Sequence, residues 1–263
     1  MRPNRIKQIW SEGRFVTLGW LSVSHGFTAE VMARQGFDAL CVDMQHGLTD
    51  MNDVWPMLQA ISQTDTVPIV RVPWNDPATI MKVLDLGAFG VIVPLVNNAE
   101  EAAKAVAACR YPPVGMRSSG PVRAVHYGGS DYLANANNEI IVMVMIETKE
   151  GIANLDAICA TPGLDAVYIG PADLSLSLGY APGLDKTDPP VVDAIRKILA
   201  ACKRHRIVAG LHNNTVAYAQ KMINDGFQFV TIASDSRFLA AKASEEVAAL
   251  RKSGVRTGRL PAY

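Results

Sequence analysis

The 263-residue sequence lacks the features that mark several large classes of protein. Its formal net charge is zero, with 25 basic and 25 acidic residues, and basic residues do not cluster. A neutral chain without a basic stripe offers no electrostatic reason to bind nucleic acid. No apolar run approaches the ~20 residues of a membrane span, and no apolar leader opens the chain. We therefore expect a cytoplasmic protein with neither a nucleic-acid partner nor a membrane segment.

Cysteine is scarce, and none of the four cysteines lies in a CxxC pair. Each sits among apolar residues inside an expected strand or helix: Cys41, Cys109, Cys159 and Cys202. Isolated cysteines of this kind are typical of small buried side chains in a reducing compartment. The sequence thus gives no sign of a cysteine nucleophile or a zinc site.

Eight short apolar runs are spread along almost the whole chain. They are continuous rather than alternating, as expected of parallel strands that are buried on both faces. The predicted strands are Thr17–Leu21, Ala39–Met44, Ile69–Pro73, Gly90–Val96, Ile140–Glu147, Ala166–Gly170, Val208–His212 and Phe229–Ala233.

Helical patterns separate these runs, and several end at a glycine just before the next strand. The predicted helices include Thr28–Arg34, Pro77–Leu86, Ala99–Cys109, Val191–Arg204, Thr215–Asp225 and Arg237–Arg251. Eight strands with intervening helices predict a single (β/α)8-barrel domain over residues 1–263, since such barrels typically have ~250 residues. A doubly wound open sheet is the alternative, but the turn GWLSVSHG lacks its GxGxxG pattern. Two irregular stretches, Tyr111–Glu139 and Tyr180–Pro190, are long enough to serve as lids or subunit contacts.

Residues that follow the strands should meet at one mouth of the barrel, where active sites of this fold lie. The polar residues at these positions are Asp43, Gln45, His46, Arg71, Glu147, Asp173, His212, Asn213, Ser234 and Asp235. Carboxylates, an arginine and histidines in one place indicate chemistry with a metal and an anion rather than a Ser-His-Asp triad.

Glu147 and Asp173 follow adjacent predicted strands, which lie ~4.8 Å apart, so both carboxylates can bind one hard cation. Two protein ligands leave room for water and a bidentate substrate, which suits Mg²⁺ or Mn²⁺. The alternative for Asp173 is a simple cap on the short helix Leu174–Leu178.

The turn Gly170-Pro171-Ala172 leads into that helix, and its free N–H groups would attract a carboxylate. Arg71 ends an apolar strand and could hold a substrate carboxylate or enolate, or else form a buried ion pair with Asp43 or Glu147. His46 can move a proton near neutral pH. The role of His212 stays ambiguous.

At this point the chain resembles the HpcH/HpaI class II aldolases, which include 4-hydroxy-2-oxoheptanedioate and 2-dehydro-3-deoxyglucarate aldolases. The likeness runs nearly end to end and includes AEVMARQGFDALCVDMQHG, PIVRVPWNDP, CRYPPVGMRSSGP, IETKEGIANLDAI and AVYIGPADLSLSLGY. The resemblance implies that Glu147 and Asp173 bind the metal and that Arg71 holds pyruvate and its enolate. It further implies that His46 is the acid/base with Asp85 as its carboxylate partner. The residues around the pyruvate carboxylate would be Gly170, Pro171 and Ala172.

The resemblance also implies a phosphoenolpyruvate/pyruvate-type barrel whose last helix, here Arg237–Arg251, is exchanged between subunits of a homohexamer of three dimers. The implied reaction is a reversible cleavage of a 4-hydroxy-2-oxo acid into pyruvate and an aldehyde, with Mg²⁺, Mn²⁺ or Co²⁺. Alternatives are oxaloacetate decarboxylation, another condensation of the pyruvate enolate, or metal-dependent binding of 2-oxo acids without turnover. The last is made plausible by two departures from the family pattern, because Gln45 replaces the usual Glu and Met145 the usual Gln. No Schiff-base lysine is expected at a strand end.

Overall fold

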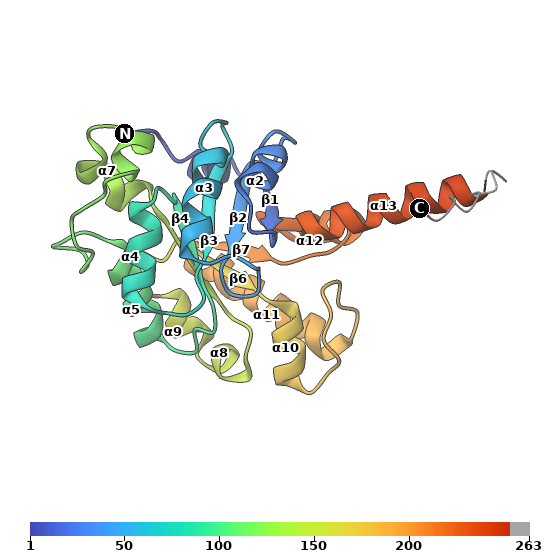
Figure 1. The fold of residues 1–263 in the computed structure, drawn as a ribbon. Helices are drawn as coiled ribbons and strands as arrows, with labels where there is room; N and C mark the ends of the chain where they lie inside the picture. Colours follow the sequence, from blue (N-terminus) through green and yellow to red (C-terminus); the bar gives the residue numbers. More distant parts are fainter. Residues whose placement is uncertain (253–263) are drawn as a thin grey trace, which may run out of the picture.

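Residues 1–252, the part described by the computed structural model, are built around a closed barrel of eight parallel strands (Figure 1). The strands pair in chain order, and β8 closes the barrel by pairing with β1. Their bounds are β1 Val16–Leu21, β2 Ala39–Asp43, β3 Val67–Arg71, β4 Gly90–Val93, β5 Ile141–Met145, β6 Ala166–Ile169, β7 Val208–Leu211 and β8 Phe229–Ser234. The predicted (β/α)8 fold is confirmed.

Several predicted strands run too far at their carboxyl ends. The run Ile140–Glu147 was expected as one strand, whereas β5 ends at Met145, and β7 ends at Leu211 rather than His212. The backbone stays extended for a residue beyond the ladder, since the His212 N–H still donates to the Ile169 carbonyl at 3.1 Å. The consequence is functional, because Glu147 and His212 lie on the loops of the mouth rather than in the barrel wall.

Helices surround the barrel, and one of them, α1, comes before the first strand (Figure 1). Their bounds are α1 Arg5–Ser11, α2 Gly26–Ala33, α3 Met51–Ile61, α4 Pro77–Asp85, α5 Ala99–Cys109, α6 Ala124–Gly128, α7 Tyr132–Glu139, α8 Lys149–Ala153, α9 Leu155–Cys159, α10 Pro171–Leu178, α11 Pro189–His205, α12 Val216–Asp225 and α13 Asp235–Lys252. The stretch 111–139 is not irregular throughout as predicted, because α6 and α7 lie within it. Likewise α10 begins at Pro171, three residues before the predicted start at Leu174.

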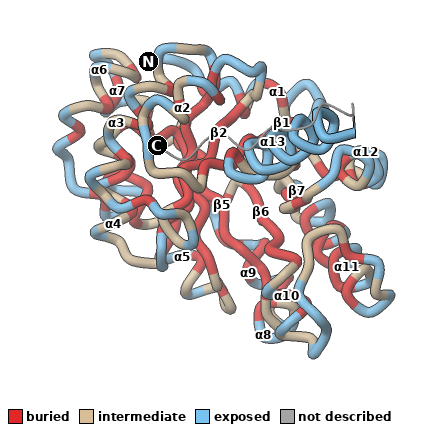
Figure 2. The backbone as a smooth tube through the Cα atoms, turned by 45° about the vertical axis from the view of Figure 1, so that its right-hand side comes forward, coloured by how far each residue is buried: buried red, intermediate tan, exposed pale blue. Residues whose placement is uncertain are grey.

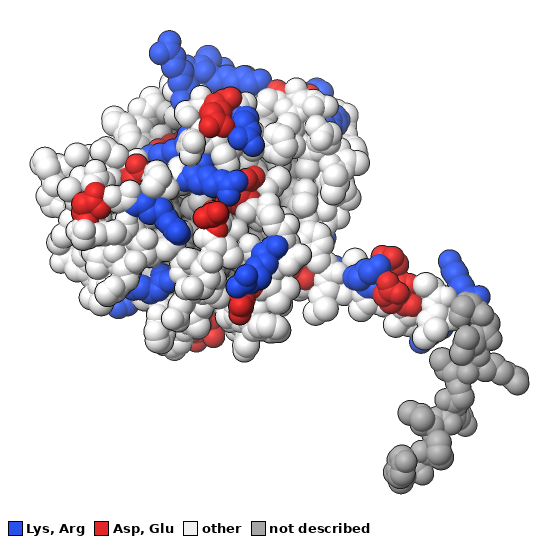
Figure 3. All heavy atoms as spheres, turned by 90° about the horizontal axis from the view of Figure 1, so that it is seen from above, with Lys and Arg blue, Asp and Glu red and all other residues white. Residues whose placement is uncertain are grey.

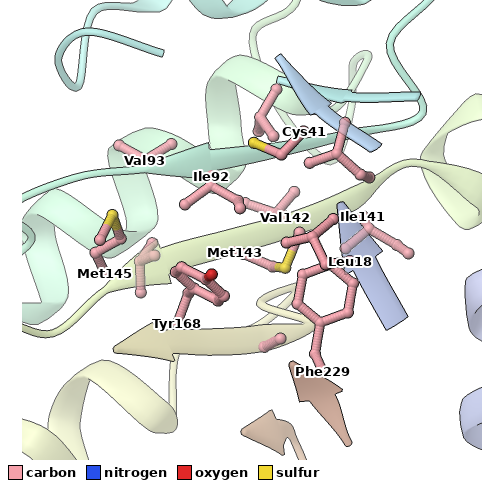
Figure 4. Packing of buried hydrophobic residues seen from close by; sticks show 14 of the residues in the cluster. Leu18, Cys41, Ile92, Val93, Ile141, Val142, Met143, Met145, Tyr168 and Phe229 are labelled. Atoms are coloured by element: carbon pink, nitrogen blue, oxygen red, sulfur yellow. The ribbon is translucent and has the colours of Figure 1, made fainter. Parts of the chain in front are cut away.

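The barrel interior is filled by side chains from many strands, including Leu18, Met143, Tyr168 and Phe229 (Figure 4). The buried strands run through the centre of the molecule, and the exposed residues gather on the surrounding helices and loops (Figure 2). All four cysteines are buried and free, as the sequence predicts. No helix among residues 1–252 is both long and apolar enough to cross a membrane.

The last helix, α13, projects from the barrel instead of covering its side (Figures 1 and 3). Asp235, its first residue, is the one buried residue of the helix, and its carboxylate accepts hydrogen bonds from the Ser22 and Val23 N–H groups. These bonds fix the start of α13 to the loop after β1. The body seen in Figure 3 carries basic and acidic side chains interspersed, in keeping with the neutral net charge.

Candidate active site

A cavity of ≈ 160 Å³ opens at the mouth of the barrel, among residues that follow several strands. It is lined by Trp20, His46, Arg71, Met145, Gly170, Pro171, Ala172, Asp173, Leu184 and His212. A larger groove of ≈ 770 Å³ lies beside Arg14, Asp38 and Phe227 at the opposite end, where strands begin. The smaller cavity is lined by a carboxylate, an arginine and two histidines. At about 30 Å³ per water, it has room for a small acid.

Glu147 is a buried carboxylate with one oxygen left unpaired. Its Oε1 accepts the Leu95 N–H at 3.0 Å, while Oε2 has no hydrogen-bond partner among the described residues. Burial raises the pKa of Glu147 to about 7, and the nearby charge of Asp173 adds to this effect. A desolvated carboxylate beside a second carboxylate is stabilised by a cation placed between them.

Asp173 lines the cavity and makes no capping hydrogen bond, so the alternative of a simple helix cap is not supported. Among residues 1–252 no third acidic, histidine or cysteine side chain completes a metal cluster. Two carboxylates alone fit Mg²⁺ or Mn²⁺, which commonly keep several waters or substrate oxygens in their coordination shell.

The backbone beside these carboxylates is shaped around them. A Cβ atom on Gly170 would lie 2.2 Å from Glu147 Oε2, so a side chain at this position would displace the carboxylate. Gly170 precedes α10, and no side chain caps the first turn of that eight-residue helix. The free N–H groups of Ala172 and Asp173 are therefore available to a carboxylate at the cavity.

Arg71 and Asp43 form a buried bidentate pair, which was one alternative raised by the sequence. Nε donates to Oδ1 at 2.8 Å and an Nη donates to Oδ2 at 2.6 Å. Burial alone would raise the pKa of Asp43, but the hydrogen bonds and charge of Arg71 outweigh it and hold the pKa below its usual value. The guanidinium has five N–H groups, so three remain for a ligand in the cavity. Arg71 also lies over the Trp20 ring, 4.7 Å from its centroid.

His46 stands exposed at the cavity on a turn that Asp43 organises. The backbone N–H groups of Gln45 and His46 both donate to Asp43 Oδ1, at 3.0 Å and 3.3 Å. The side-chain Oε1 of Gln45 is buried without a hydrogen-bond partner among the described residues. Asp43 thus holds both Arg71, which lines the cavity, and the turn that carries His46.

The structure does not bring Asp85 to this mouth. Asp85 is the last residue of α4, and a helix that precedes a strand ends where that strand begins, at the opposite end of the barrel. Its carboxylate accepts a hydrogen bond from Arg117 at 2.8 Å. Within one chain, the carboxylate that serves the His46 turn is Asp43.

A model of the HpcH/HpaI aldolase/citrate lyase family matches residues 17–241. The chain belongs to this family. The hydroxypyruvate/pyruvate aldolase of Rhizorhabdus wittichii is 41% identical over 248 residues, which cover 94% of this chain and 99% of the relative. The 4-hydroxy-2-oxo-heptane-1,7-dioate aldolase of Salmonella dublin is 38% identical over 251 residues, 94% of each chain.

Solved structures agree. A family member from Burkholderia cenocepacia superposes with a TM-score of 0.87 at 33% identity, covering 94% of this chain and 99% of that one. The named relatives are aldolases, which are carbon–carbon lyases, and this HpcH/HpaI family member is an enzyme of that class.

Sequence reasoning missed three residues that shape this HpcH/HpaI site. Trp20 could have been found by applying the strand-end rule to β1. Leu184 lines the cavity from the loop after α10, and no sequence signal marks it. Leu95, which donates its N–H to Glu147, has a φ of 53° that a leucine rarely adopts. Such strain is typical of functional sites.

Proposed function

We propose that the protein is a divalent-metal-dependent aldolase that reversibly cleaves a 4-hydroxy-2-oxo acid into pyruvate and an aldehyde. The observation that carries this proposal is the unpaired Glu147 Oε2, buried beside Asp173 at an uncapped helix start. Glu147 and Asp173 can bind a cation, and the backbone N–H groups beside them can bind an anion. Together they suit a small acid that chelates a metal. Arg71 supplies a fixed positive charge to the same cavity.

The chain's own residues account for binding and charge. The N–H groups at the start of α10 hold the substrate carboxylate, and the free N–H groups of Arg71 hold the 2-oxo group. Mg²⁺, Mn²⁺ or Co²⁺ on Glu147 and Asp173 would supply Lewis-acid stabilisation of the developing enolate. Arg71 stabilises the same negative charge, and its pairing with Asp43 holds it in place before the reaction begins.

His46 handles the proton. In the cleavage direction it takes the proton of the 4-hydroxyl group, the carbonyl of the aldehyde forms, and the C3–C4 bond breaks. The electron pair of that bond becomes the pyruvate enolate, which then takes a proton at C3. The exposed position of His46 allows it to exchange its proton with water.

The metal requirement is tested on the purified full chain with pyruvate and a panel of aldehydes. Chelation should abolish aldol turnover, and Mg²⁺, Mn²⁺ or Co²⁺ should restore it. Glu147→Gln should remain inactive in saturating metal, whereas Glu150→Gln, on the exposed surface three residues further on, should behave as wild type. Full turnover in a metal-free preparation would refute the proposal, as would a pyruvyl–lysine adduct trapped by borohydride, since that indicates an imine mechanism.

We also propose that α13 docks on a second copy of the chain, within a homohexamer of three dimers. The helix projects from its own barrel and exposes Phe238, Leu239 and Val247. Exposed apolar side chains on a protruding helix are typical of a subunit interface. Light scattering should give a hexamer mass, and Leu239→Glu should reduce it. A monomer for the wild-type chain would contradict this assembly.

A further inference from the structure

One wall of the cavity carries a polar group to which the proposed reaction gives no role. His212 follows β7 and lines the cavity together with Trp20 and Leu184. Its ring packs edge-on against Trp20, with centroids 4.6 Å apart. The Trp20 N–H is already donated to Asp43, at 3.1 Å, so Trp20 offers the His212 ring no hydrogen bond.

Hydrogen bonds from the barrel interior orient His212. Nδ1 of its ring lies 3.0 Å from the Tyr168 hydroxyl. The backbone of the next residue, Asn213, is held by Thr231, whose hydroxyl donates to the Asn213 carbonyl at 3.2 Å and accepts the Asn213 N–H at 2.7 Å. Tyr168 itself projects into the packed interior beside Met143 and Phe229 (Figure 4).

The bond at Nδ1 leaves Nε2 available in either neutral form of the ring. When Nδ1–H donates to Tyr168, Nε2 keeps its lone pair, and when Nδ1 accepts from Tyr168, Nε2 carries the hydrogen. Among the described residues Nε2 has no hydrogen-bond partner.

The ring is also uncharged. Burial lowers the pKa of His212 to about 3, and the positive charge of Arg71 acts in the same direction. An uncharged ring adds no positive charge that would attract the carboxylate of a 2-oxo acid. Nε2 forms a hydrogen bond with an alcohol in either neutral form, because a hydroxyl group both donates and accepts. An apolar substrate group closing over Nε2 would leave it unpaired.

We propose that His212 is a specificity-determining residue that forms a hydrogen bond with an alcohol group of the substrate. The enzyme then prefers a hydroxylated 2-oxo acid or a hydroxylated aldehyde over the analogue without that hydroxyl. This inference rests on the proposed function, because it concerns the substrates of the same cavity. Sites that hydrogen-bond a substrate hydroxyl discriminate against its absence far better than apolar pockets do.

The test uses four substrate pairs with the metal-loaded full chain: pyruvate or hydroxypyruvate, each with acetaldehyde or glycolaldehyde. The measured quantity is the ratio of kcat/KM for a hydroxylated substrate to that for its plain analogue. His212→Leu should lower this ratio by about 10- to 100-fold, the effect of one lost buried hydrogen bond. His212→Gln keeps a group that both donates and accepts hydrogen bonds, and it should recover part of the ratio. Leu184→Met changes the same wall without changing a hydrogen-bonding group and should leave the ratio within about twofold.

The four pairs also locate the hydroxyl. A ratio that falls only between the two 2-oxo acids places it on the acid, and one that falls only between the two aldehydes places it on the aldehyde. Either result supports the inference, while an unchanged ratio in folded His212→Leu and His212→Gln overturns it.

Failure of the proposed function is recognised separately, as the absence of turnover by the wild type with all four pairs. In that case calorimetry with the Mn²⁺-loaded protein compares the Kd values of hydroxypyruvate and pyruvate. Wild-type preference for hydroxypyruvate that disappears in His212→Leu supports the role of His212, and equal ratios in both proteins refute it.

Discussion

Two buried arginines, each paired with an aspartate and lying over an aromatic ring, stand at opposite ends of the barrel. At the mouth, Arg71 pairs with Asp43 and lies over Trp20. At the other end, Arg117 pairs with Asp85 and lies 4.5 Å from the centroid of the Tyr111 ring. Both arginines are almost fully buried, with exposed fractions of 8% and 1%.

What differs is the space around each guanidinium. Arg117 also donates to the Tyr132 hydroxyl at 3.0 Å, and protein encloses it completely. Arg71 lines the cavity, and three of its N–H groups remain for a ligand. An arginine paired with an aspartate therefore fastens a loop where protein encloses it, whereas the same pairing beside a cavity leaves N–H groups available to a ligand.

The largest expected effect is on aldol cleavage, and it should occur with a substitution at the mouth but not at the opposite end. His46→Ala should lower aldol cleavage by about 10²- to 10⁴-fold, because the 4-hydroxyl proton loses its base. Oxaloacetate decarboxylation forms the same enolate by losing CO₂ and needs no such base, so it should fall much less. Asp85→Asn, at the enclosed end, should leave the ratio of the two activities at the wild-type value.

Both activities are measured on one preparation with saturating metal, so that lost metal is not mistaken for a lost base. An equal fall of both activities in folded His46→Ala would move the proton-transfer role to another residue. A changed ratio in Asp85→Asn would instead return Asp85 to the reaction, through a neighbouring subunit.

The next effect compares the two arginines directly. Arg71→Ala should lower both reactions by about 10²- to 10³-fold per folded molecule, because both need charge stabilisation of the enolate. Arg71→Lys should recover little, since an ammonium does not reproduce the planar fork. Arg117→Ala should act on stability, lowering the free energy of unfolding by about 3 kcal/mol while the folded fraction stays active.

Denaturant titration and exchange of the pyruvate methyl protons provide the two readouts. Normal proton exchange in Arg71→Ala would remove Arg71 from the mechanism. Lost activity without lost stability in Arg117→Ala would erase the contrast between the two ends.

The sequence predicted most of this arrangement. Continuous apolar runs mark strands buried on both faces, and the strand-end rule gathered Glu147, Asp173, Arg71 and His46 at one mouth. Two helices, α3 and α7, were not predicted from the sequence. The sequence of α7, YLANANNE, has too few apolar residues for a helical pattern, whereas α3 does carry a signal, a capping box from Asp50 to Asp53. The family resemblance implies that Asp85 assists His46. Its position at the end of α4, before β4, keeps it away from the mouth of its own chain, and its role stays a prediction. The sequence could not predict that protein encloses Arg117 while Arg71 lines a cavity, because this difference depends on packing by distant segments.

The smallest expected effect concerns stability against pH and tests whether His212 stays uncharged. Its pKa of about 3 in the folded protein lies below the ordinary value of 6.5, with Arg71, Asp43 and Arg237 as the charged neighbours. The unfolded chain therefore takes up a proton below pH ~6.5 that the folded protein refuses, and this lowers stability as the pH falls towards 3. One pKa unit corresponds to about 1.4 kcal/mol, so wild type should lose about 2 kcal/mol relative to His212→Gln between pH 7 and pH 5. Asp43 does not cause this difference, because it is present in both proteins and its pKa is held low. Denaturant unfolding of both proteins at pH 7, 6 and 5 measures the gap. Parallel stability curves would mean that the folded protein accepts the proton on His212. A charged His212 would then bind the substrate carboxylate instead of selecting a substrate hydroxyl.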